Sequence, residues 1–332
     1  MTSDLPTKIG SYRIVGKLGE GDMGVVWEGV TADEKLRVAI KTLRPNPDKE
    51  WITETRLLME ARIPCLIEHP GIVRVFDFGR DSNGRGYFVM ELLRGETLGQ
   101  RIKACGAVEP GQAVNLAHQV ASALAAAHAM DIVHRDVEPE NIMLVPDPVR
   151  PGRENTKLFD FGVARLMSPN DGPHLKGVGL IVGTPLTISP EQCVGSFDVD
   201  DRTDVYSLGV VLYWMLAGKP PFSAADIGEL LAMQIYMAPP ALADIAPSAP
   251  QPLVQLVHRM LKKKRDARPR MAEVVSELSR LGGASNAVTP PTAVVRPTAL
   301  VSPTAAVLSQ RRSTPTWAGI WRWLRGVKAG PP

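Results

Sequence analysis

Two short stretches carry the residues whose types and spacing could do chemistry. His134 to Asn141, written HRDVEPEN, places an amide five residues after Asp136, which is the spacing of a phosphate-transfer loop. Asp160 follows further on, in the tripeptide Asp-Phe-Gly. Asn141 and Asp160 offer the hard oxygen ligands that magnesium prefers when phosphate supplies the others. The same loop carries a second acid, Glu138, two residues after Asp136.

A glycine-rich string near the N-terminus could hold phosphate groups. Gly19 to Val26, written GEGDMGVV, fits the pattern G-x-G-x-x-G-x-V, in which glycines let backbone N–H groups approach a triphosphate. The pattern alone also fits a dinucleotide-binding turn or a flexible hairpin. We expect a second strand after it rather than a helix, which argues against the dinucleotide-binding turn.

The elements that must position these residues differ between the two halves of the chain. Short β-branched segments that predict strands span residues 12–18, 25–30, 37–43, 72–78 and 87–92. Apolar residues at helical spacing predict a helix over 51–63, and residues 113–130, rich in Ala and Leu, predict another. The stretch 204–217 is apolar on nearly every face, which is typical of a helix buried at the centre of a domain.

Composition and charge indicate a soluble globular protein. The chain has 332 residues, of which 44% are hydrophobic and 22% charged, with a formal charge of +3. Residues 284–332 hold six Lys or Arg and no Asp or Glu, so residues 1–283 carry −3. We therefore expect no nucleic acid partner. Three scattered cysteines and the lack of an 18-residue apolar run favour a cytoplasmic protein with reduced thiols.

The C-terminal residues differ in composition from the rest. A hexad repeat, PTAVVR-PTALVS-PTAAVL, begins at Pro291 and favours an extended linker over 282–316. Beyond it, residues 317–332 form a basic segment rich in tryptophan, in which Trp317, Trp321 and Leu324 would share one face of a helix. Residues 317–328 could contact a membrane surface or a partner, and a docked or frayed end is the alternative.

Several motifs occur together in a fixed order. After the glycine string come Val38-Ala-Ile-Lys41, Tyr87 to Leu93, the HRDVEPEN loop and Asp160-Phe-Gly. Over about residues 12–281 the chain therefore resembles eukaryotic-like serine/threonine protein kinases of bacteria. The resemblance implies an α+β, two-lobed protein-kinase-like fold. Its lobes would be an antiparallel β N-lobe with one main helix (12–93) and a mainly α-helical C-lobe (94–281), after an N-terminal extension (1–11).

The resemblance also implies roles for individual residues, with ATP and Mg²⁺ as cofactors and proteins as substrates. Asp136 would accept the proton of the substrate hydroxyl, while Asn141 and Asp160 would hold magnesium. Lys41 would hold the phosphates and pair with Glu60, with Glu54 as the alternative acid. The residues implied to line the ATP site are Leu18, Gly19, Glu20, Gly21, Asp22, Met23, Gly24, Val25, Val26, Ala39, Lys41, Met90, Glu91 and Leu93.

Further along the chain, the resemblance implies contacts that hold the large lobe together. Asp204 would tie the HRDVEPEN loop to the apolar helix over 204–217, and Arg268 would pair with Glu191. Thr187 stands where the family usually has Tyr, so substrate docking is left open.

Two departures from the family pattern bear on activity. Glu138 replaces the Lys that usually contacts the γ-phosphate, and one such electrostatic contact is worth roughly 10²–10³ in rate. Residues 169–183 contain no Ser, Thr or Tyr. We therefore expect no switching by phosphorylation in the middle of this stretch, and only Ser168, Thr184, Thr187 and Ser189 flank it.

The sequence thus predicts a kinase that transfers the ATP γ-phosphate to protein Ser or Thr, including its own. Because of Glu138, the alternative is a pseudokinase or a weakly active nucleotide-binding scaffold. A small-molecule phosphotransferase of the same fold is a third reading, which Ser189-Pro-Glu191 and Arg268 argue against.

Overall fold

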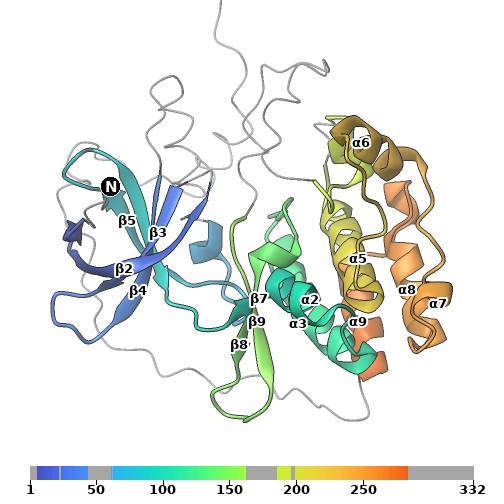
Figure 1. Cartoon of the computed structure of the whole chain (residues 1–332), viewed down its shortest axis with the longest axis horizontal. Coiled ribbons are helices and arrows are strands. Elements are labelled where there is room, and N and C mark those ends of the chain that lie inside the picture. Colours follow the sequence, from blue (N-terminus) through green and yellow to red (C-terminus); the bar gives the residue numbers. More distant parts are fainter. Residues whose placement is uncertain are drawn as a thin grey trace, which may run out of the picture. The chain divides into compact units, whose positions relative to one another are not determined.

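The computed structural model describes residues 6–21, 24–43, 61, 63–161, 185–195 and 199–282. Within them the N-terminal half forms a six-stranded antiparallel sheet of order β1-β2-β3-β4-β6-β5 (Figure 1). Its strands are β1 (Lys8–Ile9), β2 (Tyr12–Gly21), β3 (Gly24–Val30), β4 (Arg37–Leu43), β5 (Val75–Arg80) and β6 (Gly86–Glu91). The strands expected from the sequence are confirmed, with ends shifted by up to three residues.

The sheet gains one strand that the sequence patterns did not indicate. β1 pairs with β2, and Ile9 is buried among Val38, Ile40 and Tyr87 on one face of the sheet. β1 therefore belongs to the sheet, although its residues lie in the segment set apart as an N-terminal extension. Of the helix expected over 51–63, Ala61 and Ile63 are described and helical.

A small three-stranded sheet of order β7-β8-β9 follows the first sheet. It consists of β7 (Glu96–Thr97), β8 (Ile142–Pro146) and β9 (Glu154–Leu158). The end of β9 is bonded to the loop before β5, because the Leu158 N–H donates to the Gly71 carbonyl and the Val73 N–H donates to the Leu158 carbonyl. These backbone bonds place Asp160, two residues beyond β9, beside the first sheet.

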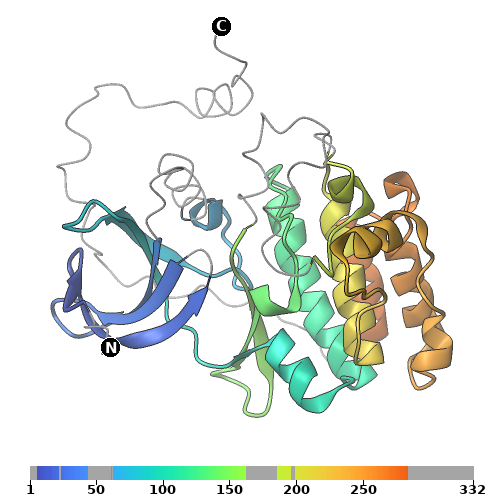
Figure 2. The ribbon, with the colours of Figure 1, turned by 45° about the horizontal axis from the view of Figure 1, so that its top comes forward.

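The C-terminal half is helical. Its elements are α2 (Leu98–Cys105), α3 (Pro110–His128), η2 (Pro139–Asn141), α4 (Pro190–Cys193), α5 (Arg202–Ala217), α6 (Ile227–Tyr236), α7 (Leu242–Ile245), α8 (Gln251–Met260), η5 (Arg265–Ala267) and α9 (Met271–Gly282). α3 packs against α5 and α9 (Figure 2), and α5 packs against α8. Among the described residues, no helix combines the length and apolar character that crossing a membrane requires.

Helix α5 lies at the centre of the helical core. Thirteen of its sixteen residues are buried, as its apolar sequence predicts. Gly209 lets α8 approach, since a Cβ at this position would lie 2.8 Å from the Cβ of Met260. Because α5 is packed on all sides, its polar residues Asp204 and Ser207 are held rigidly where they face the loops of the site.

Candidate active site

The glycine string forms a hairpin. β2 ends at Gly21 and β3 begins at Gly24, and these two residues are paired in the antiparallel ladder. A Cβ at Gly19 or Gly21 would meet no other atom within 4 Å, so the backbone there is open to a close ligand. The hairpin excludes the dinucleotide-binding turn. Asp22 and Met23 lie outside the described residues, while Leu18, Glu20, Val25 and Val26 occupy the two strands.

Lys41 lies in the middle of β4, between Val26 of β3 and Phe88 of β6. Its side chain is buried, and its Nζ lies 2.8 Å from Oδ1 of Asp160. An ammonium group this far from water requires an anionic partner. The pair joins residues that are 119 positions apart in the sequence. It places a cation that could bind phosphate, Lys41, beside an anion that could bind a metal ion, Asp160. The expected partner Glu60 and its alternative Glu54 lie outside the described residues.

The HRDVEPEN loop holds its amide and its carboxylate together. Val137, Pro139 and Asn141 are buried and anchor the loop, which ends in η2. The Asn141 side-chain N–H₂ donates to the Asp136 carbonyl at 3.0 Å and to the Asp136 carboxylate at 3.2 Å. This orientation of the amide leaves its Oδ1 as the atom that could bind a cation. This loop therefore holds Asp136 and Asn141 together, and the N–H of Phe159, next to Asp160, donates to the Asn141 carbonyl at 3.2 Å.

Backbone strain flanks these residues. Arg135 has φ +66° and Asp160 has φ +53°, both in the left-handed region that non-glycine residues rarely adopt. Each such residue costs on the order of 1 kcal/mol, so the surroundings must hold it. Arg135 precedes Asp136, the predicted proton acceptor, and Asp160 is a predicted metal ligand. No local preference of Arg predicts this geometry, whereas Asp is one of the non-glycine residues that adopt it more often.

Asp204 supplies part of that support, as expected. One oxygen accepts the Arg135 N–H at 2.8 Å, and the other accepts the His134 N–H at 2.8 Å and Nε2 of His128 at 2.7 Å. Complete burial acts to raise the pKa of Asp204, but the hydrogen bond and charge of His128 and the contacts with His134 outweigh it and hold the pKa below its usual value. The sequence patterns did not identify His128, which lies 76 residues away.

His134 connects the loop to Phe159 and Phe161, on either side of Asp160. Its Nδ1 accepts the Asp136 N–H at 3.3 Å, so its Nε2 donates to the Phe159 carbonyl at 3.2 Å. The centroid of its ring also lies 4.4 Å from the centroid of the Phe161 ring. Complete burial lowers the pKa of His134 despite the nearby acids, which agrees with a neutral ring.

The residues implied to contact adenine lie on β4 and around the end of β6. Ala39 is buried and pairs with Met90 across the ladder. The N–H of Glu91 donates to the Arg74 carbonyl at 2.9 Å, so of the Glu91 backbone its carbonyl is the group that could face a base. The Glu91 carboxylate is bound by Lys157 at 2.6 Å. Leu93 follows the strand, outside the ladder.

The predicted pair of Glu191 and Arg268 is confirmed and fully bonded. Two guanidinium nitrogens reach the two carboxylate oxygens at 2.7 and 2.8 Å. The remaining donors reach the carbonyls of Arg202, Lys262 and Lys263 at 2.7–3.0 Å, so all five N–H groups are used. Burial acts to raise the pKa of Glu191, but Arg268 outweighs it and holds the pKa below its usual value. The pair fastens α4 to the core.

The segment before α4, residues 185–189, is held by side chains that donate hydrogen bonds to its backbone carbonyls. Gln234 donates to the Leu186 carbonyl at 2.7 Å, and Ser207 donates to the Thr187 carbonyl at 2.7 Å. Thr187 and Ser189 are buried, so their hydroxyls are closed to a modifying enzyme in this conformation. Ser168 and Thr184, the other two residues flanking the stretch without hydroxyls, lie outside the described residues.

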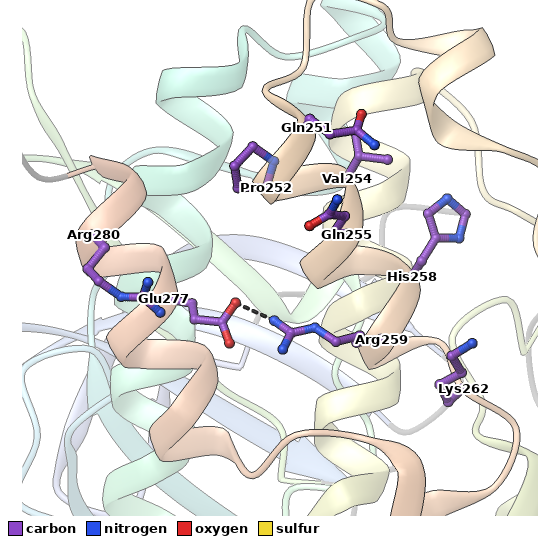
Figure 3. A pocket seen from close by; sticks show the side chains of 9 residues that line it. All are labelled: Gln251, Pro252, Val254, Gln255, His258, Arg259, Lys262, Glu277 and Arg280. Atoms are coloured by element: carbon purple, nitrogen blue, oxygen red, sulfur yellow. Dashed lines mark hydrogen bonds and ion pairs between the residues drawn. The ribbon is translucent and has the colours of Figure 1, made fainter.

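A groove of about 700 Å³ lies away from these residues, between α8 and α9 (Figure 3). It is lined by Gln251, Pro252, Val254, Gln255, His258, Arg259, Lys262, Glu277 and Arg280. An ion pair between Arg259 and Glu277 crosses it. None of the predicted site residues lines this groove.

The glycine hairpin and the buried Lys41 come from the β-sheet half of the chain, and the loop that holds Asp136 and Asn141 together comes from the helical half. The protein kinase domain family matches residues 12–278, and the chain belongs to this family. It is 37% identical over 284 residues to the serine/threonine-protein kinase pkn2 of Myxococcus xanthus, covering 85% of this chain and 34% of that protein. It is also 37% identical over 263 residues to PknA of Mycobacterium tuberculosis, covering 77% and 58%.

Solved structures show the same fold. The kinase domain of Mycobacterium tuberculosis PknI superposes with a TM-score of 0.62 at 25% identity, covering 83% of this chain and 99% of that one. The chain spans 34% to 58% of the length of the two curated relatives named above.

Proposed function

We propose that this protein is a serine/threonine protein kinase that transfers the γ-phosphate of ATP to hydroxyls of proteins, itself included. The observation that carries the proposal is the convergence of Lys41, Asp136, Asn141 and Asp160, with Lys41 and Asp160 only 2.8 Å apart. The names of the curated relatives support the residue class of the substrate.

The donor atoms also suit Mg²⁺. Oδ1 of Asn141 and the carboxylate of Asp160 are hard oxygen ligands, and magnesium bound to proteins commonly takes one or two such groups plus phosphate. When bound there, the ion would neutralise charge on the phosphates. The proposed ligands are therefore Asn141 and Asp160.

The transfer itself needs few groups from the protein. The Asp136 carboxylate accepts the proton of the substrate hydroxyl while the hydroxyl oxygen bonds to the γ-phosphorus. The bond from that phosphorus to the oxygen that bridges it to the β-phosphate breaks, which releases ADP. Lys41 and the open backbone of the glycine hairpin orient the phosphates. Positioning and electrostatics supply most of the rate.

Glu138 bears on the rate of this reaction. It is half-buried in extended backbone, and its carbonyl accepts the Asn141 N–H at 3.0 Å. A carboxylate in place of the usual lysine removes a cation from the transferred phosphate, which is worth roughly 10²–10³ in rate. It leaves the other phosphate-handling groups in place, so nucleotide binding should persist.

Incorporation of labelled phosphate from MgATP tests the proposal. We expect slow incorporation by the wild type, none by Asp136→Asn, and faster incorporation by Glu138→Lys. If the wild type is inactive and Glu138→Lys gains activity, the protein is a pseudokinase as it stands. If neither incorporates phosphate while both bind ATP, the kinase proposal is refuted.

Two further proposals rest on the sequence, because the residues concerned lie outside the described part. We propose a cytoplasmic protein whose residues 317–328 contact a membrane surface or a partner, and liposome co-sedimentation of the full chain against one ending at Leu308 tests the membrane contact. We also propose that autophosphorylation avoids residues 169–183, and phosphosite mapping after incubation with MgATP tests this.

A further inference from the structure

Gln192 links the segment before α4 to the loop of the proposed catalytic base. It lies on α4, and its side-chain Oε1 accepts the Ser189 N–H at 3.2 Å and the Ser189 hydroxyl at 3.1 Å. Its Nε2 donates to the Arg135 carbonyl at 2.9 Å. One planar amide therefore spans two segments that are 57 residues apart in the sequence.

The bond to Arg135 falls on the strained residue of the loop. Arg135 has φ +66°, and its N–H is bound by Asp204 of α5 at 2.8 Å. Its carbonyl is bound by Gln192 of α4. Both polar groups of this backbone unit are thus held by side chains from two different helices. A left-handed residue persists where its surroundings hold it in this way.

The position of Asp136 follows from that of Arg135. The Arg135 carbonyl belongs to the peptide bond whose nitrogen is that of Asp136, and this peptide is planar. A donor that fixes the carbonyl therefore also fixes the direction in which the chain enters Asp136. Small displacements of a catalytic group are costly, because the rate depends on near-attack geometry.

The segment that precedes α4 is itself held by long-range hydrogen bonds. Gln234 and Ser207 hold the carbonyls of Leu186 and Thr187, and Ser189 is fully buried. Gln192 is anchored to this segment through Ser189, so its N–H₂ group is oriented toward Arg135 independently of the bond that it makes there. The arrangement fits a positioning contact better than an adaptable surface amide.

We propose that Gln192 is a positioning residue for phosphoryl transfer, which holds the strained Arg135 peptide and through it the carboxylate of Asp136. The proposal rests on the kinase activity proposed above. The side-chain hydrogen bonds of Gln192 go to Ser189 and Arg135, so its effect should fall on kcat rather than on ATP binding.

Two substitutions separate the two ends of the amide. Gln192→Glu keeps the acceptor for Ser189 and removes the donor to Arg135. Gln192→Lys keeps a donor that can reach Arg135 and removes the acceptor for Ser189. Gln119→Glu is a matched control, because Gln119 also bridges backbone groups, accepting the Thr156 N–H at 2.9 Å and donating to the Glu154 carbonyl at 3.1 Å.

The assay is steady-state phosphorylation of casein by the full chain, in the wild type and in a Glu138→Lys background. Melting temperature and ATP binding are measured on every variant.

For Gln192→Glu we expect kcat to be about tenfold lower and KM for ATP to be unchanged, which is the effect of one lost hydrogen bond. Gln192→Lys should keep kcat within about threefold and raise KM for casein. Gln119→Glu should change both constants less than about twofold.

The pH profile distinguishes positioning from loss of structure. A protonated carboxyl at position 192 can donate to the Arg135 carbonyl, whereas a carboxylate cannot. The ratio of kcat for Gln192→Glu to kcat for the wild type should therefore rise as the pH is lowered from about 8 to about 5.5. If Gln192→Glu does not fold, Gln192→Met, which lacks both groups, takes its place against Gln192→Lys.

Several results would overturn the proposal. An unchanged kcat in Gln192→Glu, equal losses in Gln192→Glu and Gln192→Lys, or an equal loss in Gln119→Glu each contradicts it. If the wild type or the Glu138→Lys chain phosphorylates casein and Gln192→Glu leaves kcat unchanged, this inference alone is refuted. No phosphorylation of casein or of the chain itself in either background refutes the kinase proposal and this inference together.

Discussion

Replacing Asp204 by Asn should both destabilise the protein and slow its reaction. In the structure one carboxylate oxygen accepts the Arg135 N–H, and the other accepts the His134 N–H and Nε2 of His128. An amide –NH₂ in the second place would face two donors, so it should occupy the first and face Arg135 alone. The Arg135 N–H would then be left without an acceptor beside a second donor.

The size of the effect follows from these contacts. A lost hydrogen bond to a charged group costs about 1.5–3 kcal/mol, and a buried N–H without a partner costs about 1–3 kcal/mol. We therefore expect a loss of about 3–5 kcal/mol in the free energy of unfolding. For a domain of this size that lowers the melting temperature by roughly 10 °C. Arg135 also loses an anchor of its strained backbone, so kcat should fall at least about tenfold.

Differential scanning fluorimetry and phosphate incorporation measure the two effects of Asp204→Asn. Asp266→Asn is the control, since it makes the same chemical change in an ion pair with Arg202 whose acid is 85% exposed, and such pairs contribute about 0–1 kcal/mol. A melting temperature for Asp204→Asn within about 2 °C of the control would refute the reasoning.

Two further outcomes are expected. The pKa of Glu191 lies below its usual 4.5, so its pairing with Arg268 adds stability above that pH that is lost on acidification. Glu191→Gln should therefore melt lower at pH 7 and show a shallower fall below about pH 5, and parallel melting curves would contradict this. Gly209→Val should cost about 1–3 kcal/mol by pressing on Met260, whereas Gly16→Ala, open on that side, should be nearly neutral in the same scan.

Local patterns predicted the elements well because they depend on neighbours in the sequence. Alternating β-branched residues indicated the strands, and the apolar stretch 204–217 indicated the buried helix α5. β1 was missed, since two residues are too few to show a period. Its place in the sheet is set by the burial of Ile9 against residues from distant strands.

The candidate site was predicted in part, by motif rather than by contact. The contacts of Asp204 and of Glu191 with Arg268 were expected from the family resemblance and are present. His128 and Gln192 were not expected, because a lone histidine or glutamine on a helix has no spacing that reveals its partner. His128 lies 76 residues from Asp204, and Gln192 lies 57 residues from Arg135.

By itself the sequence determined which chemistry this protein carries, since residue types and their order specify a lysine, an acid, an amide and a second acid. Only the tertiary structure decided how they are held. The left-handed backbone of Arg135 runs against local preference and is maintained by long-range bonds to the side chains of Asp204 and Gln192. Such bonds form only when the whole core has packed, so no local pattern encodes them.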